Sequence, residues 1–529
     1  MNVLKSITTV VAILAVAAMP AFAEKTTPAT DKNSAVPAVP RAIPDLIPYH
    51  KFDPPTSKLF DISKLTISGD LRVRPEFRTN DRFGLSSHEL ASARAGSKRN
   101  TFFVQQWTRL GLHYTVSPDV VFFFQPQYSK NWGRGGGPRA SEGGSFGGSF
   151  ADANSTQGTI FARQAFMLLR NFLMPDLTVK VGRQLVVWGN HRMFGHFDWN
   201  NVGWSHDGVT ANYKLAPHMT LQAGWLRVDE GNCGSPTSGG CGGTKATSDA
   251  DIIYVRAPTK LMGLLVEPTY IWHSGGTGDS GADNLPPHHA GISRDGARPG
   301  DQSRHTIGGR VVKKMGMGGS RIDTTVEGYW QFGEIGNYAT GRYATGRNVD
   351  IDAYAFHIDG GVTLPVPMQP RIGGEYNVAS GNNPDDESEW GGFDQLYPTN
   401  HIHFGYMDRM SWKNMVHYSV GLQLRPTRDS HFEVTGHWFY LNDEKDHWYG
   451  ANQNVFIQSP DGNQEDSLGK EIDVVYTMFF TPDNHVAWQI GGGVFFPGDY
   501  IDDNPAAPRL NGVEVPNTTW GYTQLWINF

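Results

Sequence analysis

Apolar and polar residues alternate along most of the chain after residue 64. In LTISGDLRVRPEFR, residues 65–78, the apolar positions Leu65, Ile67, Leu71 and Val73 alternate with polar or charged ones. Successive side chains of a β-strand point to opposite sides, so this period of two predicts a strand with one apolar and one charged face. The apolar face could meet the core of a soluble sandwich or the lipid around a barrel.

The connections between such runs decide between a sandwich and a barrel. Short links with turn residues, such as SPD at 117–119 and RPTRDS at 425–430, alternate with long links rich in Gly, Asp and Asn, such as 130–158, 274–303 and 379–410. This asymmetry is typical of outer-membrane barrels, and a sandwich has no reason to keep it. The alternating runs predict about eighteen strands. They span roughly 65–78, 100–116, 119–131, 159–172, 176–188, 207–215, 218–229, 249–258, 262–274, 303–313, 320–333, 350–364, 369–379, 411–426, 429–442, 467–479, 484–496 and 518–529.

We therefore expect an all-β fold, a transmembrane antiparallel β-barrel over residues 61–529 with long extracellular loops and short periplasmic turns. An even number of strands places both ends of the barrel in the periplasm. The last run, WGYTQLWINF, puts Leu525, Ile527 and Phe529 on the lipid face. Pairing this run with the first removes the sheet edge that hydrocarbon would not tolerate. Its final aromatic residue resembles the signal that outer-membrane assembly machinery recognises.

Residues 1–60 lack the alternation. Residues 1–23 combine Lys5, an apolar stretch from Ile7 to Met19 and the small-residue site Ala21-Phe22-Ala23, which is the layout of a cleaved secretory signal. The alternative is a membrane anchor, but the apolar stretch is shorter than the roughly 20 residues of a spanning helix. Residues 24–60 are rich in Pro and predict an extended periplasmic leader.

Composition supports the barrel. Hydrophobic residues make up only 39% of the 529 residues and the mean hydropathy is −0.40, yet aromatic residues reach 12% and Gly numbers 62. A barrel spreads its apolar residues over alternate positions, which explains a low mean hydropathy beside many aromatic side chains. The net charge of −7 is mild and argues against nucleic acid as a partner.

Candidate chemistry outside the barrel pattern is sparse. Cys233 and Cys241 predict a disulfide that closes a Gly/Ser-rich loop. No G-x-S-x-G, H-E-x-x-H or P-loop occurs, and the neighbours in SHDG at 205–208 alternate faces, so they cannot form a triad with one another. The segments HIHFGYMDR and DHWYG could supply metal ligands, but polar loop histidines beside aromatic residues are more often rim residues. We expect no enzyme activity, metal or cofactor.

One long stretch, residues 162–209, carries GRQ at 182–184, the WG and RMFG that follow, DW at 198–199 and SHDGV. With FDQLYPTNHIHFGYMD at 393–408, GKEIDVVYTMFF at 469–480 and GGGVFFPGDY at 491–500, it resembles the alginate export family of outer-membrane proteins. The resemblance implies a monomeric, 18-stranded pore in the outer membrane of a Gram-negative bacterium. It also implies a lumen lined with basic residues that hold an anionic uronate polymer.

The alternation places basic side chains inside the first half of the barrel and acidic ones inside the second. Arg183 falls on the apolar side of its strand, which predicts a rim position, a bulge or a structural pair. For each single arginine, an ordinary ion pair between strands is as good an explanation as solute contact. The expected inward acidic groups are Asp323, Glu327, Asp359, Glu375, Glu433, Glu471 and Asp473, with His357, His417, His431 and His437 near them. The candidate solute-binding residues are Arg72, Arg74, Arg109, Arg163, Lys180, Arg192 (in a long loop that could fold inward), Arg371 and Arg425.

These patterns favour a passive channel for hydrophilic solutes, anionic ones among them, and a field across the lumen that suits small polar or zwitterionic molecules. One alternative is an exporter of an anionic exopolysaccharide such as alginate. A second is a barrel that surrounds a periplasmic electron-transfer partner. The expected partners are outer-membrane lipid, the solute or polysaccharide, and the assembly machinery, and we expect a monomer.

Overall fold

The computed structural model describes residues 61–80, 100–132, 159–229, 250–275, 302–335, 349–383, 388–451, 453, 455–457, 463–481, 483–502 and 515–529. The expected signal sequence (1–23), the expected leader (24–60) and the cysteines Cys233 and Cys241 lie outside the described residues. Residues from Ile62 to Phe529 form one compact unit.

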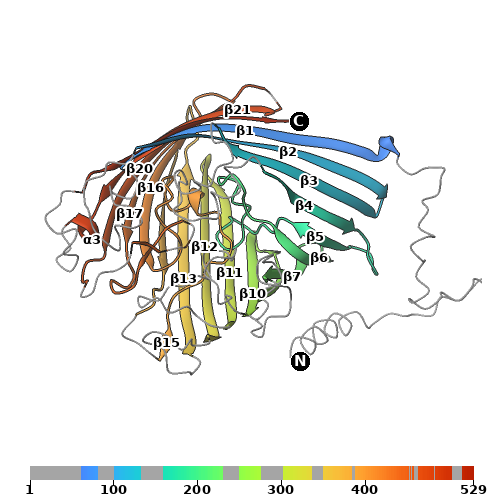
Figure 1. Ribbon diagram of the computed structural model, residues 1–529, viewed down its shortest axis with the longest axis horizontal. Coiled ribbons are helices and arrows are strands. Elements are labelled where there is room, and N and C mark those ends of the chain that lie inside the picture. Colours follow the sequence, from blue (N-terminus) through green and yellow to red (C-terminus); the bar gives the residue numbers. More distant parts are fainter. Residues whose placement is uncertain are drawn as a thin grey trace, which may run out of the picture. The chain divides into compact units, whose positions relative to one another are not determined.

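Within the described residues, eighteen antiparallel strands form the wall of a closed barrel, as the alternation and turn spacing predicted (Figure 1). Each strand pairs with the next along the chain, and the short turns join them on one side. The strands are β1 (Leu65–Thr79), β2 (Thr101–Ser117), β3 (Val120–Asn131), β4 (Thr159–Leu169), β5 (Leu177–Gln184), β6 (His206–Ala216), β7 (Met219–Asp229), β8 (Ala250–Arg256), β10 (Leu264–Gly275), β11 (Gln302–Met317), β12 (Ser320–Ile335), β13 (Val349–Thr363), β14 (Arg371–Ala379), β16 (Met415–Leu424), β17 (Ser430–Tyr440), β20 (Ser467–Phe479), β21 (Val486–Pro497) and β22 (Thr518–Asn528).

Short elements complete the fold. Strand β9 continues β8 after Pro258, β15 pairs with β13, and β18 and β19 form a separate hairpin. Two ends of the expected strands differ from the prediction: β5 stops at Gln184, where the expected run reached residue 188, and β16 starts at Met415, where the expected run began at residue 411. The short elements are η3 (Ile62–Lys64), β9 (Thr259–Leu261), β15 (Glu389–Trp390), η6 (Asn400–Ile402), β18 (Trp448–Tyr449), β19 (Val455–Ile457) and α3 (Asp499–Asp502).

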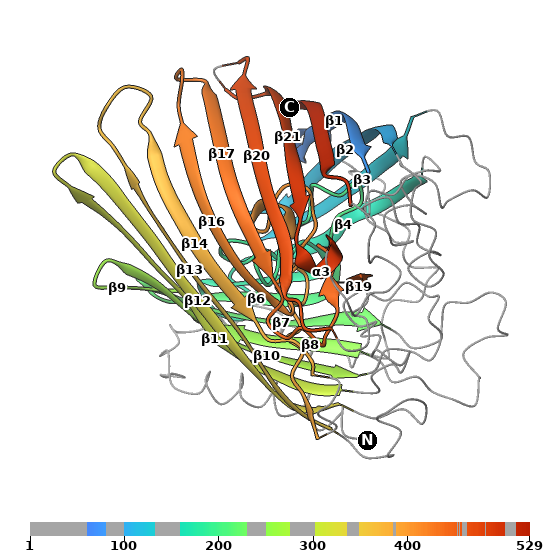
Figure 2. The same ribbon diagram turned by 90° about the vertical axis from the view of Figure 1, so that its left-hand side faces the viewer.

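The first and last strands close the barrel, and we call their pairing the seam. Strand β1 pairs with β22 from Asp70 opposite Asn528 to Thr79 opposite Thr519. The backbone N–H and C=O of Phe529 both bond to Gly69, at 3.0 Å each. Figure 2 shows β14, β16, β17, β20 and β21 side by side in the wall that leads to this seam. No edge of the wall is left at the seam, which is the requirement for a sheet surrounded by hydrocarbon.

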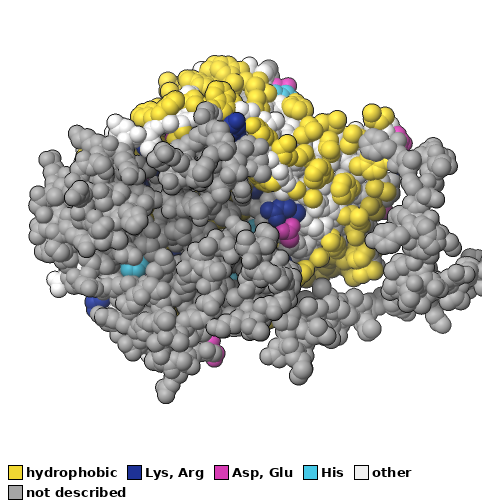
Figure 3. Space-filling model, in the orientation of Figure 1, with side chains coloured by type: hydrophobic (Ala, Val, Ile, Leu, Met, Phe, Trp, Pro, Cys, Tyr) yellow, Lys and Arg dark blue, Asp and Glu magenta, His cyan; other side chains and the backbone are white. Residues whose placement is uncertain are grey.

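The two faces of the wall differ in chemistry as the alternation predicted. On β1, Ile67 and Phe77 are about half exposed on the outside, whereas Arg72 and Arg74 on the inside are almost fully buried. Hydrophobic side chains cover the outer surface over β1–β4 (Figure 3). An apolar band on the outside of a closed barrel matches the hydrocarbon of a bilayer.

Among the described residues, no helix is long and apolar enough to cross a membrane.

The interior of the barrel holds a hydrophobic core that belongs to loops. We call residues 185–205, between β5 and β6, the first inner loop, and residues 380–383 and 388–414, between β14 and β16, the second inner loop. Phe194 and Trp204 of the first loop join Phe404 and Trp412 of the second in one buried cluster with inward residues of the wall. Residues 441–451 contribute Trp448 to the same cluster. The barrel therefore surrounds packed side chains as well as polar space.

The seam generates the first testable prediction. The ring of Phe529 lies over Gly69 so closely that any side chain at residue 69 would overlap it. We expect Phe529→Ala and Gly69→Val each to lower the amount of folded barrel in the outer membrane. The decrease should exceed the one expected from losing the burial of a single phenyl ring, which is worth roughly 1.5–3 kcal/mol. The reason is that both substitutions disturb the pairing of β1 with β22. The measurement is the heat-modifiable fraction in gel electrophoresis of outer-membrane preparations.

The matched control is Leu525→Ala, which removes another lipid-facing side chain of β22 that does not lie over Gly69. Equal folded amounts for Phe529→Ala, Gly69→Val, Leu525→Ala and the unchanged protein would contradict this account of the seam.

Candidate functional site

A carboxylate of the first inner loop is held by two arginines of the wall. Asp198 accepts two hydrogen bonds from Arg109 of β2, at 3.0 and 2.8 Å, and one from Arg163 of β4, at 2.9 Å. The two-pronged contact between a guanidinium and a carboxylate fixes orientation as well as distance. Asp198 thus fastens the loop to the wall at a defined position.

Burial by itself would raise the pKa of Asp198, but the charges of Arg109 and Arg163 outweigh that effect and hold the pKa well below the usual value of an aspartate. The carboxylate is therefore charged at any physiological pH. The contact is an ion pair in a setting shielded from water, where the loss of one partner is costly.

Two further arginines bind the backbone of the same loop. Arg72 donates to the carbonyl oxygens of Asp198 and Trp199, and Arg74 donates to that of Trp199 at 2.9 Å. The guanidinium groups of Arg72 and Arg109 each lie about 3.6–3.7 Å from the ring centre of Trp107. Stacked arginines that also reach loop carbonyls form a rigid cradle for the loop.

The second inner loop is held by carboxylates of the wall. Asp473 accepts the backbone N–H of Tyr406 at 3.0 Å, and Glu471 accepts that of Met407 at 2.9 Å. Gly405 has a φ of +81° and lies against the Glu471 carboxylate, where a side chain would not fit. These residues bring the loop backbone close to β20.

The two inner loops also bind each other. The ring of Trp199 stacks on His401 at 3.8 Å with an angle of 11° between the planes. Backbone bonds join Gly195 to Tyr397 and Tyr397 to Met193, at 2.8 and 2.9 Å. The loops therefore act as one unit inside the barrel.

Arg192 connects this unit to the opposite wall. Its guanidinium donates to Glu375 at 3.0 Å and to Asn377 at 3.1 Å, both on β14, and its Nε lies 3.8 Å from Glu327 on β12. The sequence indicated that Arg192 could fold into the pore, and the structure places it there, 2% exposed.

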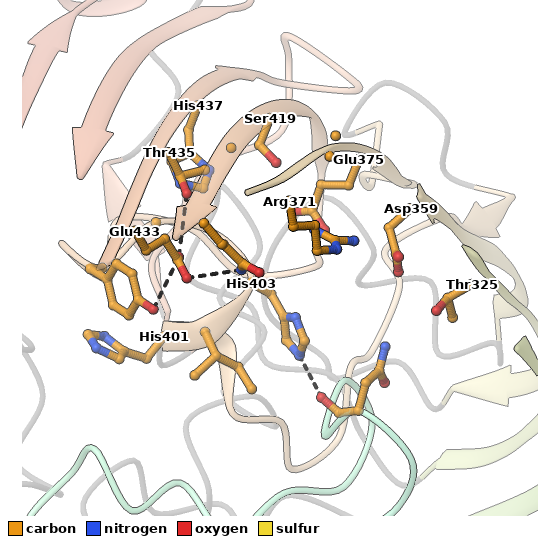
Figure 4. Close-up of a pocket in the computed structure, with 18 of the residues that line it drawn as sticks. Thr325, Asp359, Arg371, Glu375, His401, His403, Ser419, Glu433, Thr435 and His437 are labelled. Atoms are coloured by element: carbon orange, nitrogen blue, oxygen red, sulfur yellow. Dashed lines mark hydrogen bonds between the residues drawn. The ribbon is translucent and has the colours of Figure 1, made fainter. Parts of the chain in front are cut away.

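A polar cavity of about 250 Å³ lies where the inner loops meet the strands β12–β17 (Figure 4). Its wall residues belong to the ends of the strands next to the short turns 364–370 and 425–429, so the cavity lies on the short-turn side of the loops. It is lined by Asn190, Arg192, Thr325, Asp359, Arg371, Gly373, Gly374, Glu375, His401, Ile402, His403, Gly405, Tyr406, Ser419, Gly421, Gln423, Glu433, Thr435 and His437.

The charges on the cavity wall are unevenly compensated. Arg371 binds both carboxylate oxygens of Asp323, at 3.0 Å for its Nε and 2.6 Å for its Nη2, and Glu375 is paired with Arg192. Glu433 and Asp359 are different. Glu433 accepts from Gln423 at 3.0 Å and has His431 at 3.6 Å, and Asp359 contacts His357 at 2.8 Å. Among the described contacts, neither carboxylate has an arginine or lysine within ion-pair distance.

The structure sorts the eight candidate solute-binding residues into three groups. Arg72, Arg74, Arg109 and Arg163 point inward, as predicted, but they are only 1–6% exposed and bind the first inner loop. The idea that they face open lumen is wrong, because the loop covers them. Lys180 also points inward, where it lies 4.6 Å from the Phe166 ring, and Arg192 and Arg371 line the cavity. Arg425 is exposed beside a short turn and does not line the cavity.

The structure also settles the position of Arg183. It forms the last pair of β4 and β5, opposite Ala165, where it binds Asp207 at 2.7 Å and donates to the carbonyl of Ala162 at 3.0 Å. It is a structural pair, one of the three interpretations that its place in the alternation allowed.

Alternation could not reveal the loop residues His401, His403 and Tyr406 of the cavity. The available signal was the cluster of aromatic residues in links otherwise rich in Gly, Asn and Asp, such as Trp188, Phe194 and Trp199. Exposed loops seldom need so many large rings. In the described part of the chain, no group of three or more His, Cys, Asp or Glu side chains is placed to hold a metal ion.

A closed antiparallel barrel with an apolar exterior, inward-folded loops and a polar interior cavity defines an outer-membrane channel of a Gram-negative bacterium. Residues 272–510 match the family model described as alginate export. The match covers slightly less than half of the chain and confirms the resemblance noted in the sequence. The sequence matches none of the curated proteins with which it was compared.

Solved structures with the same fold include proteins of Pseudomonas aeruginosa and Acinetobacter baumannii. OccK8 (OprE) of Pseudomonas aeruginosa is 11% identical with a TM-score of 0.52, covering 88% of this chain and 98% of that one. OccK9 (OpdG) of the same organism is 11% identical with a TM-score of 0.53, covering 88% and 99%. OccAB1 of Acinetobacter baumannii is 12% identical with a TM-score of 0.51, covering 88% and 96%. At this identity the likeness is one of fold alone.

The Asp198 contact generates the second prediction. In Asp198→Asn, Arg109 and Arg163 stay buried without their counter-charge, so we expect the docked position of the first inner loop to lose about 3–5 kcal/mol. A released loop should widen the lumen and raise single-channel conductance in planar bilayers. The control is Asp207→Asn, which breaks the exposed pair with Arg183 and should cost less than about 1 kcal/mol. Unchanged conductance in both variants would show that Asp198 does not hold the loop.

Two histidines of the inner loops generate the third prediction. Burial lowers the pKa of His191 to about 4, and burial together with Arg192 places the pKa of His403 well below its ordinary value. Both imidazoles are neutral in the docked loops, whereas in detached loops they would protonate near pH 6.5. The stability that they give to the docked loops is complete above about pH 6.5 and falls as the pH drops towards 4.

We therefore expect more frequent gating events at pH 5 than at pH 7.5 in planar bilayers. The double variant His191→Gln with His403→Gln should lose most of this difference, since glutamine does not titrate and can still donate to the carbonyl of Asn190. The same gating frequency at both values in the unchanged protein would contradict the prediction.

Proposed function

We propose that the protein is a passive channel for small hydrophilic solutes, whose selective region is the cavity beneath the two inner loops. The observation that carries the proposal is the packing of the loops. Their shared aromatic core occupies the interior between the walls and leaves a polar cavity of about 250 Å³. That volume suits a molecule of one small ring or chain better than a polymer strand.

The cavity also determines which charges a solute would meet. The four arginines of β1, β2 and β4 that could have attracted anions are bound to the first inner loop and buried beneath it. The charged side chains on the cavity wall are Asp359, Glu375 and Glu433, together with Arg192 and Arg371, which are both paired with carboxylates. We infer a preference for neutral, zwitterionic or cationic solutes over anions.

The exporter of an anionic polysaccharide remains the second candidate, because the match over residues 272–510 is to the alginate export family. It would require the inner loops to move aside, so that the buried arginines could meet the polymer. A barrel around an electron-transfer protein would require the same space, which the described loops fill. The proposal of a channel without enzyme activity rests on the fold and on the family match.

Ion selectivity tests the proposal, and it is the fourth prediction. We expect a cation-selective channel in planar bilayers with asymmetric KCl. The double variant Asp359→Asn with Glu433→Gln replaces the two cavity carboxylates that have no arginine or lysine within ion-pair distance. It should move the reversal potential towards that of an anion-selective channel. Each carboxylate near a permeating ion contributes on the order of 1 kcal/mol in a watery lumen, which corresponds to a change of about fivefold or less in the permeability ratio.

Asp207→Asn serves again as control, since it removes a carboxylate from outside the cavity and should leave the reversal potential unchanged. The result that would overturn the charge argument is anion selectivity in the unchanged protein. The result that would overturn the channel itself is the lack of any single-channel conductance from correctly folded protein.

A further inference from the structure

The floor of the cavity is a stretch of wall where three glycines lie side by side, partly covered by one arginine side chain. Gly361 of β13, Gly373 of β14 and Gly421 of β16 lie opposite one another in register and share the inward face. The guanidinium of Arg371 lies across Gly361 and against Gly373, where added side chains would overlap it, and Gly373 and Gly421 line the cavity. Glycine at neighbouring positions lets a ligand approach the backbone closely. The result is a flat surface made of the Arg371 guanidinium over Gly361 and of the backbone at Gly373 and Gly421.

Hydroxyl, amide and carboxylate groups surround this floor. Ser419 and Gln423 lie two residues to either side of Gly421 on β16, and Thr435 lies opposite Gly421 on β17. Glu433 and Asp359 stand on the flanking strands (Figure 4). Hydroxyl and amide groups both donate and accept, and carboxylates accept only, so the rim offers many acceptors to a ligand rich in O–H and N–H donors. A flat ring edged with donors fits both the floor and the rim.

We propose that the cavity binds a pyranose ring that carries an ammonium group, that is, a small amino sugar. The ring face lies on the backbone at Gly373 and Gly421 beside the Arg371 guanidinium, and its hydroxyl groups bond to the rim. The ammonium group meets Glu433, whose described contacts are Gln423, Thr435, Tyr406 and His431, with no arginine or lysine within ion-pair distance. Arg192 and Arg371 of the cavity already bind Glu375 and Asp323, so a sugar carboxylate beside Glu433 and Asp359 would be repelled. The inference rests on the proposed channel function and names its solute class.

Three sugars with the same ring size separate the contribution of ligand charge from that of ligand shape. Glucosamine, glucose and glucuronate differ chiefly in charge, so they report the charge preference of the cavity at almost constant shape. We expect each glucosamine molecule to interrupt the current through single channels of the full-length protein in planar bilayers. Its residence time should be at least fivefold longer than that of glucose, and glucuronate should give the shortest events.

Two variants assign the effect to the cavity. Glu433→Gln should bring the residence time of glucosamine down to that of glucose measured in the same variant. Gly421→Ala, which places a methyl group on the floor, should shorten the events of both glucosamine and glucose while the KCl conductance persists. Asp207→Asn should change none of these values. Heat-modifiability in gels shows that each variant is folded before it is compared.

Glucosamine events no longer than those of glucose, longer events with glucuronate, or a Glu433→Gln variant with unchanged glucosamine events would each overturn the proposal. If the folded protein gives no conductance at all, the channel function has failed and the binding site can still be tested. Calorimetric titration of the detergent-solubilised protein should then show glucosamine bound at least fivefold more tightly than glucose. No preference in that titration overturns the inference independently.

Discussion

The interior of this barrel depends on one charge. Asp198 has its carboxylate held between Arg109 and Arg163, with Arg72 and Arg74 bound to the backbone around it. Water is scarce there, so the ions stabilise one another only if all are present and correctly placed. The position of Asp198 fixes the first inner loop, the stack of Trp199 on His401 then positions the second, and the second forms the roof of the cavity.

The fold could be predicted from the sequence because a barrel obeys two local rules. Alternation of apolar and polar residues marks each strand, and the difference between short and long links sets the order and orientation of the strands. The same alternation correctly predicted that Arg72 and Glu375 point inward. It could not predict what they meet there, since the partner of Arg72 is more than 120 residues away in the chain and belongs to a loop.

The misplaced strand ends have the same origin. Residues 185–188, LVVW, have the composition of a strand, and a local rule extends β5 through them. The structure turns the chain inward at Leu185, because Val186 and Trp188 are buried in the core inside the barrel rather than against lipid. Apolar residues of a barrel protein can serve either environment, and only tertiary contacts distinguish them. The cavity could not be predicted for this reason, since seven of its nineteen lining residues belong to the two inner loops.

The residues that fasten the first inner loop and those that form the cavity floor occupy different parts of the wall. The cradle of the loop uses β1, β2 and β4, whereas the floor and its rim use β12, β13, β14, β16 and β17. Substitutions in the floor or its rim need not disturb the cradle. Barrels of this kind could therefore exchange Glu433, Ser419 or Thr435 during evolution and accept a different solute, while the cradle of the first inner loop stays intact. Specificity would then diverge quickly among relatives whose overall architecture scarcely changes.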